Sequence, residues 1–389
     1  MRNKVSTIVG EGNVSDKETD LFVYKHDGSS LEGHPKLVVW PSTTEEIARV
    51  VRLANVRNIP VVVRGGGTSS AGGTLAEDAI LLDLSRMNKI ISLNLTERSV
   101  TLQPGVTVVH VNTLLASYAL FFPIIPHTTA GVSTLGGLVS RNASSSRRFG
   151  RAGDWVMSLE VVDGTGKVFT PSRIPLFLGS EGVLGIITQL TLKLVKPPVM
   201  LSGSWKKLGL LEELPSVLSD LRADKDVLGV EFFDNYCSQL LGFEDAPHLW
   251  IEYVFLDKGD IKDQSKIMAV QKKMHLLYAL LKQNKFTLHT DPFVPEQGIL
   301  EFIKFCRKKD IPLYGHLDSG VFHACVRKEH PEFAYKVYKM AQKLHGYPGG
   351  EYGVGRLWKE YIPEKVKQEL KEHKKFYDPS GILNPGCLI

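Results

Sequence analysis

Residues 59–74 read IPVVVRGGGTSSAGGT, an apolar stretch that runs directly into a glycine-rich loop. The β-branched residues 59–63 predict a strand. The glycines after it allow backbone N–H groups to converge on one anion, as in a nest for phosphate oxygens. The loop is not a Walker loop, because no Gly-Lys-Ser/Thr follows, and not a Rossmann fingerprint, because a strand rather than a long helix comes next. A flexible surface turn is the alternative interpretation.

The segments around this loop alternate between strand and helix patterns. Residues 36–40 (KLVVW) predict a strand, and Ser42 with Glu45 predicts a capping box that opens a helix. The apolar face of this helix leads to the strand at 59–63, so the region reads strand–helix–strand. Further short strands and a helix follow up to residue 194, which predicts a mixed α+β domain.

Two more loops of small residues follow in the same region. The first, PHTTAGVSTLGG at residues 126–137, is rich in hydroxyls and amides, and the second, GSEGVLGI at residues 179–186, precedes an alternating strand. Three such loops, each after a strand, predict that their backbones cradle one long dinucleotide. Each loop alone is weak evidence, so the ordered triplet carries the prediction.

The chain changes character after Pro197-Pro198, which marks the best domain boundary. Lysines become more frequent, and residues 265–283 predict an amphipathic, core-facing helix. Two turn signals near the end, DPSG at 378–381 and NPG at 384–386, predict a closing tail rather than another domain. The length of 389 residues suggests two domains, or three.

Composition excludes several classes of protein. The net charge of +5 is mild for 389 residues, so nucleic-acid binding is not expected. No window approaches 18 uninterrupted apolar residues, and the first 20 residues lack the apolar core of a signal peptide. Four scattered cysteines without a C-x-x-C pair predict reduced thiols, a cytoplasmic location and no iron–sulfur cluster.

Several motifs together resemble the FAD-binding oxidoreductases of the vanillyl-alcohol oxidase (PCMH) superfamily. They are PSTTEEIARVVRLANVRNIPVVVRGGGTSSAGG, STLGGLVSRNA, FGRAGDWVMSLEVVDGTGKV and GSEGVLGIITQLTL, and near the end GHLDSGVFH, GGEYGVG and YDPSGILNPG. The branch they resemble holds the glycolate oxidase flavin subunit, D-lactate dehydrogenases and D-2-hydroxyglutarate dehydrogenase. The resemblance implies an α+β fold with a two-part PCMH-type FAD-binding domain, at residues 1–198 and 350–389. A smaller α+β (ferredoxin-like) substrate or cap domain would occupy residues 199–349.

The resemblance also implies which residues bind FAD. The pyrophosphate would lie against the first loop, and the flavin against the second loop with Asn142. The adenosine half would lie against the third loop. The residues expected to bind the cofactor are Arg64, Gly65, Gly66, Gly67, Thr68, Gly72, Gly73, Pro126, Ser133, Thr134, Gly136, Gly137, Asn142, Glu181, Gly182 and Ile186. Many relatives attach flavin covalently to a histidine in the first loop. Thr68 stands at that place, so we expect noncovalent FAD.

A second group of residues predicts a metal site. His316 and His323 are seven residues apart across a turn or strand, and Glu351 offers a carboxylate, a donor set that suits Zn²⁺ or Mn²⁺. Unrelated histidines are the alternative on spacing alone. The resemblance implies that these three residues bind a divalent metal and that the residue after Glu351 acts as the base. That residue is Tyr352, an unusual base because its reference pKa is about 10.

Other residues of this region match the branch only in part. Ser319 and Val321 replace an expected Asp and Asn, and Cys387 replaces a lysine in the closing motif. Lys359 matches the family's lysine after the glycine motif. The expected catalytic residues are therefore Tyr352, His316 and Lys359.

The leading hypothesis is an FAD-dependent oxidoreductase that transfers the hydride of a small 2-hydroxy acid, such as D-lactate or glycolate, to flavin N5. Two alternatives remain: oxidation of another alcohol with a tyrosine acid/base, and a flavin-binding subunit whose own site has decayed. The expected partners are a small-molecule substrate and an electron-acceptor subunit or carrier. Peripheral association with a membrane stays open, whereas a transmembrane segment is not expected.

Overall fold

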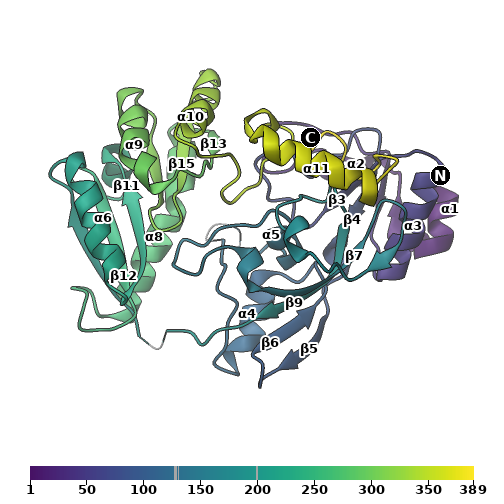
Figure 1. Ribbon diagram of the computed structural model, residues 1–389, viewed down its shortest axis with the longest axis horizontal. Helices are drawn as coiled ribbons and strands as arrows, with labels where there is room; N and C mark the ends of the chain where they lie inside the picture. The colour runs from purple at the N-terminus through teal and green to yellow at the C-terminus, as the bar shows by residue number, and fades with distance from the viewer. Residues whose placement is uncertain (127–128, 130, 199) are drawn as a thin grey trace. The chain divides into compact units, whose positions relative to one another are not determined.

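The computed structural model describes residues 1–126, 129, 131–198 and 200–389 (Figure 1). Its contacts divide the chain into two units. Unit 1 contains Met1–Ala143, Arg151–Lys196 and Tyr352–Ile389, and unit 2 contains Ser144–Gly150 and Pro197–Glu351. The sequence did not predict that the short segment Ser144–Gly150 belongs to unit 2. The domain boundaries predicted between residues 198 and 199 and between residues 349 and 350 stay predictions.

Unit 1 begins with a small sheet in the order β1-β2-β4-β3. Its strands are β1 (Val14–Ser15), β2 (Leu37–Val39), β3 (Val61–Arg64) and β4 (Ile80–Asp83). The β4 strand pairs in parallel with both β2 and β3, and α3 (Thr44–Val56) connects β2 to β3. The predicted strand–helix–strand unit is therefore confirmed. The apolar face of α3, with Ile47 and Val51, packs in a core that also contains Val5 of α1 (Arg2–Val9).

The predicted capping box is wrong by one residue. The N-cap of α3 is Thr43, whose side chain accepts a hydrogen bond from the N–H of Glu46 at 3.2 Å. The Glu46 carboxylate in turn accepts from the N–H of Ser42 at 2.6 Å. Three hydroxyl residues, 42–44, precede two glutamates here, so the sequence fits the capping-box motif in two registers, Ser42 with Glu45 and Thr43 with Glu46.

A second sheet of unit 1 is antiparallel, in the order β5-β6-β9-β7-β8. Its strands are β5 (Ile90–Asn94), β6 (Ser99–Leu102), β7 (Val156–Val162), β8 (Val168–Phe169) and β9 (Ile186–Lys193). The remaining helices of unit 1 are α2 (Glu18–Val23), α4 (Val108–Ala116), α5 (Leu135–Ser140) and α11 (Glu364–Tyr377), with the 3-10 helices η1 (Glu11–Asn13), η2 (Leu84–Arg86), η3 (Ala152–Trp155), η4 (Ile174–Leu176) and η7 (Lys359–Tyr361).

The C-terminal tail packs beside β3. The Val61 N–H donates to the Ile382 carbonyl at 2.8 Å, and the Asn384 N–H donates to the Val61 carbonyl at 2.8 Å. The Asn384 side chain also accepts from the Val63 N–H at 2.9 Å. The last residues of the chain therefore hold the strand that leads into the first glycine loop.

Unit 2 contains one antiparallel sheet in the order β10-β12-β11-β14-β15-β13. Its strands are β10 (Ser202–Lys207), β11 (Val227–Phe233), β12 (His248–Tyr253), β13 (Leu288–Thr290), β14 (Leu313–His316) and β15 (Val321–Val326). Its helices are α6 (Leu214–Ala223), α7 (Asn235–Leu240), α8 (Gln264–Gln283), α9 (Ile299–Lys308) and α10 (Glu332–Lys343), with η5 (Leu211–Glu213) and η6 (Glu296–Gly298).

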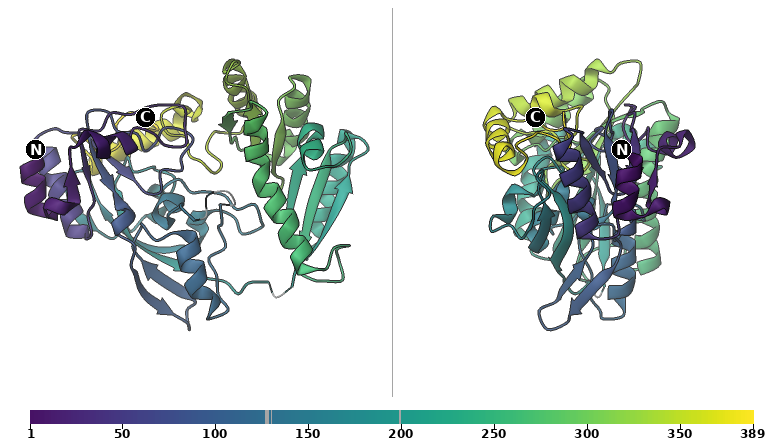
Figure 2. Two further views of the ribbon diagram at one scale, coloured as in Figure 1. Left: turned by 180° about the vertical axis from the view of Figure 1, so that it is seen from behind. Right: turned by 90° about the vertical axis from the view of Figure 1, so that its right-hand side faces the viewer.

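Different helices pack on the two faces of this sheet. The predicted amphipathic helix is α8, and its buried Ile267 and Leu277 share a core with Trp250. The left view of Figure 2 shows α8 in front of the sheet. Phe302 of α9 packs on Phe322 of β15, whose side chain points to the opposite face from His323. The predicted α+β class is thus confirmed for both units.

The four cysteines are free thiols and all are buried. Among the helices in the described part of the chain, none combines the length and apolarity needed to cross a membrane.

Candidate functional site: a glycine-lined pocket and a histidine–carboxylate cluster

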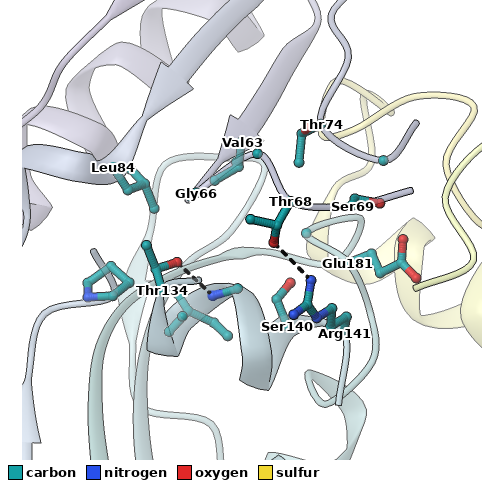
Figure 3. A pocket seen from close by; sticks show the side chains of 18 of the residues that line it. Val63, Gly66, Thr68, Ser69, Thr74, Leu84, Thr134, Ser140, Arg141 and Glu181 are labelled. Atoms are coloured by element: carbon teal, nitrogen blue, oxygen red, sulfur yellow. Dashed lines mark hydrogen bonds between the residues drawn. The ribbon is translucent and has the colours of Figure 1, made fainter. Parts of the chain in front are cut away.

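A pocket in unit 1 brings the three small-residue loops together (Figure 3). Its lining surrounds about 810 Å³ of atom-free space, part of which is open solvent. Twelve of the sixteen residues predicted to bind the cofactor line it: Gly65, Gly66, Gly67, Thr68, Gly73, Ser133, Thr134, Gly136, Gly137, Glu181, Gly182 and Ile186. Their individual contacts with a cofactor stay predictions. His127, Thr128 and Ala130 of the second loop lie outside the described residues.

Four of the predicted residues do not line this pocket. The Arg64 guanidinium donates to the His26 carbonyl at 2.9 Å and lies over the Tyr24 ring. Gly72 faces Leu31 instead, and Pro126 is likewise absent from the lining. Asn142 follows α5 in the left-handed conformation (φ 50°), and its Oδ1 accepts from the Gly153 N–H at 2.8 Å. The side chains of Arg64 and Asn142 therefore form hydrogen bonds with backbone groups of other segments.

Tyr352, predicted as a catalytic residue, also lines this pocket. The sequence did not predict ten further lining residues: Val63, Ser69, Thr74, Leu84, Pro104, Ser140, Arg141, Gly185, Ile187 and Asn384. Arg141 donates to the Thr68 hydroxyl at 3.3 Å, which links the first loop to the end of α5 (Figure 3). The available signal for Arg141 was its place in the motif STLGGLVSRNA, four residues after the second loop.

Glycine is required in these loops because backbone segments approach closely. A Cβ on Gly66 would collide with the Val132 carbonyl, and one on Gly136 would lie 2.9 Å from the Pro104 carbonyl. Neither glycine has a positive φ, whereas Gly67 has φ +64°. The close approach of one loop to the next therefore excludes side chains at Gly66 and Gly136 before any cofactor is considered.

Glu181 ties the third loop to the C-terminal segment of unit 1. Its Oε1 accepts from the Val354 N–H at 2.6 Å and its Oε2 from the Gly355 N–H at 2.9 Å. Burial raises the pKa of this carboxyl. The Asn384 side chain donates to the Glu181 carbonyl at 2.6 Å. Because both carboxylate oxygens already have donors, Glu181 shapes the wall of the pocket.

The first loop offers donors that suit a pyrophosphate. Among the described residues, no acceptor faces the N–H groups of Gly66, Gly67 or Thr68. Backbone N–H groups in a folded protein nearly always have a partner, so a row of open ones at a pocket indicates an anionic ligand. Open backbone donors beside a pocket lined by three small-residue loops suit a dinucleotide cofactor.

Comparisons with known proteins specify that cofactor. Residues 35–172 match the family "FAD binding domain", and residues 260–388 match "FAD linked oxidases, C-terminal domain". The chain is 31% identical to the D-2-hydroxyglutarate dehydrogenase of Xanthomonas citri, over 92% of this chain and 89% of that protein. It is 28% identical to the glycolate oxidase subunit GlcD of Bacillus subtilis, over 100% of this chain and 96% of that protein. The chain belongs to the FAD-linked oxidases, and it is an FAD-dependent oxidase or dehydrogenase.

Solved structures show the same fold at low identity. The 4-ethylphenol oxidase of Gulosibacter chungangensis matches with a TM-score of 0.77 and 17% identity, over 99% of this chain and 95% of that one. A p-cresol methylhydroxylase matches with a TM-score of 0.74 and 14% identity, again over 99% and 95%. The predicted PCMH-type fold is therefore confirmed, and the family matches above confirm the predicted FAD-linked oxidoreductase.

Unit 2 contains a cluster made of His316, His323 and Glu351, whose ligand atoms lie within 4.8 Å of one another. The Nε2 atoms of the two histidines are 3.2 Å apart, and His316 Nε2 is 2.8 Å from Glu351 Oε1. The histidines come from the neighbouring strands β14 and β15. Asp291 accepts the Glu351 N–H at 2.8 Å and so fixes the start of that residue's side chain.

The spacing of these donors fits a divalent metal. Two nitrogens bound at about 2.0–2.1 Å to a tetrahedral zinc ion lie about 3.3 Å apart. The observed separation of 3.2 Å is close to this value. Two imidazoles and a carboxylate also form a common catalytic zinc set. The three predicted ligands therefore lie together, and the identity of the ion stays a prediction.

A fourth residue, Glu231 of β11, was missed by the sequence analysis. Its carboxylate oxygens lie 2.7 and 2.8 Å from His316 Nδ1, on the side away from the cluster. Burial disfavours the charged form of His316, but the carboxylates of Glu231 and Glu351 outweigh it and raise the pKa of the imidazole. No local sequence signal marks Glu231, because strand pairing places it beside His316.

The other side of the cluster is aromatic. The His289 ring stacks on the His323 ring at 5.0 Å, and its Nε2 is 3.3 Å from the Tyr314 hydroxyl. Burial lowers the pKa of His289 to about 3, so this ring stays neutral. His289 therefore supports the cluster by packing.

The predicted catalytic residues Tyr352 and Lys359 belong to unit 1. Tyr352 directly follows Glu351 in the chain and lines the glycine-lined pocket, where its carbonyl accepts from the Ser69 hydroxyl at 3.1 Å. Lys359 begins η7 and is not part of the pocket lining. The chain thus passes in one peptide bond from the cluster of unit 2 to the pocket of unit 1.

Proposed function

We propose that this protein oxidises a small 2-hydroxy acid, with FAD bound noncovalently in the glycine-lined pocket. The single observation that carries the proposal is the succession Glu351-Tyr352, which joins the histidine–carboxylate cluster to that pocket. The names of the relatives support the substrate class, since they include a glycolate oxidase subunit, D-lactate dehydrogenases and D-2-hydroxyglutarate dehydrogenases. Thr68, in place of a histidine, supports noncovalent binding.

The residues of the cluster would hold the substrate hydroxyl. His316, His323 and Glu351 would hold a divalent ion, which would supply Lewis acidity and lower the pKa of a bound hydroxyl. His316 presents Nε2 to the cluster while Glu231 holds Nδ1, so the imidazole is fixed in orientation. FAD supplies the hydride acceptor at N5.

Tyr352 would orient the hydroxyl or relay its proton. With the hydroxyl acidified by an ion, a strong base is less necessary. The position of Lys359 outside the lining favours Tyr352 over Lys359 for this role. The electrons would then pass to a separate subunit or carrier, because the described residues hold no second cluster of metal-ligating side chains.

Anaerobic reduction tests this function. The FAD-loaded protein is mixed with a panel of D- and L-2-hydroxy acids and simple alcohols, and flavin absorbance is followed. Bleaching by a hydroxy acid supports the proposal. Bleaching by plain alcohols alone contradicts it in favour of a different alcohol, and no bleaching by any substrate indicates a flavin-binding subunit without its own activity.

A further inference from the structure

The sheet of unit 2 positions the two histidines of the cluster, whereas Glu351 lies outside its strands. His316 pairs with Val321 and Tyr314 pairs with His323, so the register of β14 and β15 sets the relative position of the two imidazoles. Glu351 comes from a later segment of the chain. Its distance from the histidines therefore depends on the contacts that hold this segment beside the sheet.

Residues 291–293, directly after β13, connect the segment of Glu351 to the start of β15. On one side, the Phe322 N–H donates to the Pro292 carbonyl at 3.1 Å, one residue before the histidine of β15. On the other side, the Gly350 N–H donates to the Asp291 carbonyl at 2.8 Å. This stretch therefore lies between the strand that carries one residue of the cluster and the segment that carries another.

The side chain of Asp291 extends this connection to the helix α10. Its Oδ2 accepts from the Glu351 N–H at 2.8 Å, and its Oδ1 accepts from the Tyr338 hydroxyl at 3.1 Å. The Asp291 N–H in turn donates to the same hydroxyl at 3.2 Å. Both Asp291 and Tyr338 are only 1% exposed. The hydroxyl of Tyr338 is therefore a donor to Asp291 and an acceptor from it, in a buried place.

We infer that Tyr338 is a positioning residue that holds Glu351 through Asp291, an inference that rests on the metal binding in the proposed function. A carboxylate with a separate donor on each oxygen is fixed in rotation. Without the Tyr338 hydroxyl, Asp291 loses a donor to Oδ1 and an acceptor of its N–H. The carboxylate then holds the Glu351 N–H less firmly, and with it the approach of Glu351 Oε1 to His316 Nε2 at 2.8 Å.

A purely stabilising role for the Tyr338 hydroxyl predicts a different result. The helix α10 packs against β13 and β15, and its Val337 and Tyr338 are both buried. Loss of a bond that only stabilises α10 lowers the free energy of unfolding and leaves the ion affinity of the folded protein unchanged. Loss of a positioning bond lowers that affinity, because groups that orient metal ligands usually contribute about 10- to 100-fold. Zn²⁺ affinity therefore separates the two roles.

Calorimetric titration of Zn²⁺ into the metal-free, FAD-loaded protein tests this inference. We expect Tyr338→Phe, which removes only the hydroxyl, to weaken Zn²⁺ binding about 10-fold and to leave the FAD content unchanged. Tyr335→Phe is the matched control, because Tyr335 is on the same helix and 49% exposed, and it should bind Zn²⁺ as the wild type does. Val337→Ala removes buried packing of α10 and keeps the hydroxyl. It controls for lost stability and should also keep the wild-type affinity.

Two substitutions of Asp291 provide a second measurement. Asp291→Ala should weaken Zn²⁺ binding about 100-fold, whereas Asp291→Asn keeps one oxygen for the Glu351 N–H and should retain more of the affinity. Equal affinities in Tyr338→Phe and Tyr335→Phe, or an equal loss in Tyr338→Phe and Val337→Ala, overturn the inference and leave the proposed function standing. If the wild type binds neither Zn²⁺ nor Mn²⁺, the metal binding in the proposed function and this inference both fail.

Discussion

At the scale of single residues, His316 is held from both sides. Its Nδ1 faces Glu231 at 2.7 Å and its Nε2 faces Glu351 at 2.8 Å. A carboxylate behind a metal-ligating histidine fixes the tautomer and the ring orientation, and its loss usually weakens metal binding about 10- to 100-fold. We therefore expect Glu231→Gln to weaken Zn²⁺ binding by that factor in competition with a chromophoric chelator. Glu244→Gln, at an exposed pair with Lys207, should bind as the wild type does. Equal affinities in both variants would contradict the role given to Glu231.

A substitution at Tyr352, the residue after Glu351, tests the proposed proton transfer separately from the proposed metal binding. We expect Tyr352→Phe to keep bound metal and flavin and to reduce turnover about 10²- to 10⁴-fold, the usual contribution of one positioned acid–base group. His316→Ala should remove both metal and activity, because it deletes a central donor of the cluster. Elemental analysis and single-turnover flavin reduction measure the two effects. An unaffected Tyr352→Phe would move the proton acceptor to Lys359 or solvent.

At the scale of the element, the start of α7 makes stability depend on pH. Asp234 accepts from the N–H groups of Cys237 and Leu313, both at 2.8 Å, and burial raises its pKa from 3.8 to about 6. The folded state therefore binds this proton more tightly than the unfolded state. The protonated Asp234 carboxyl therefore adds to the free energy of unfolding. This addition is fully present below the unfolded pKa of 3.8 and is lost as the pH rises through the folded pKa of about 6.

The size of this effect follows from linkage. A shift of about two pKa units corresponds to about 3 kcal/mol. Asp234→Asn keeps a good N-cap residue and removes the titration. Urea unfolding at about pH 4 and about pH 7 should show a smaller pH difference in this variant than in the wild type. If the free energy of unfolding changes by the same amount between the two pH values in both proteins, the pH dependence comes from groups other than Asp234.

The glycine loops behave as elements that pack against one another. We expect Gly66→Val to lose FAD and stability, because its side chain collides with the Val132 carbonyl. The control is Gly131→Val in the neighbouring loop, where none of the residues that the structure describes lies within 4 Å of a Cβ. Flavin absorbance of the purified variants measures occupancy. Full occupancy in Gly66→Val would count against the pocket as the FAD site.

The elements that the sequence predicted are those with a local signal. Glycine loops, the amphipathic helix α8 and the alternating strand β9 follow from composition and periodicity over a few residues. Glu231 and Arg147 had no such signal, because strand pairing and a chain excursion into unit 2 give them their neighbours. Arg147 and Arg148 form ion pairs with Glu252 and Asp318, partners more than 100 residues away in the sequence.

At the scale of the whole molecule, unit 1 is assembled from three separate parts of the chain. Its pocket is complete only when the tail returns to β3, since Asn384 bridges the Val63 N–H and the Glu181 carbonyl. Contacts between residues so distant in sequence form late and slow folding. FAD binding should therefore depend on a tail residue as strongly as on the loops.

Asn384→Ala tests this dependence. The change removes two hydrogen bonds at 2.9 and 2.6 Å and leaves the Val63 N–H and the Glu181 carbonyl without these partners. Each lost partner of a buried group costs about 1–3 kcal/mol, part of which appears as weaker FAD binding, about 10- to 100-fold. Fluorescence titration of the apoprotein with FAD measures the affinity. Asn94→Ala, which removes a bond within an exposed turn to the Glu97 N–H, is the control and should bind FAD normally. If Asn384→Ala binds FAD as tightly as Asn94→Ala, the first loop is held without the tail, and the closing motif has no part in the pocket.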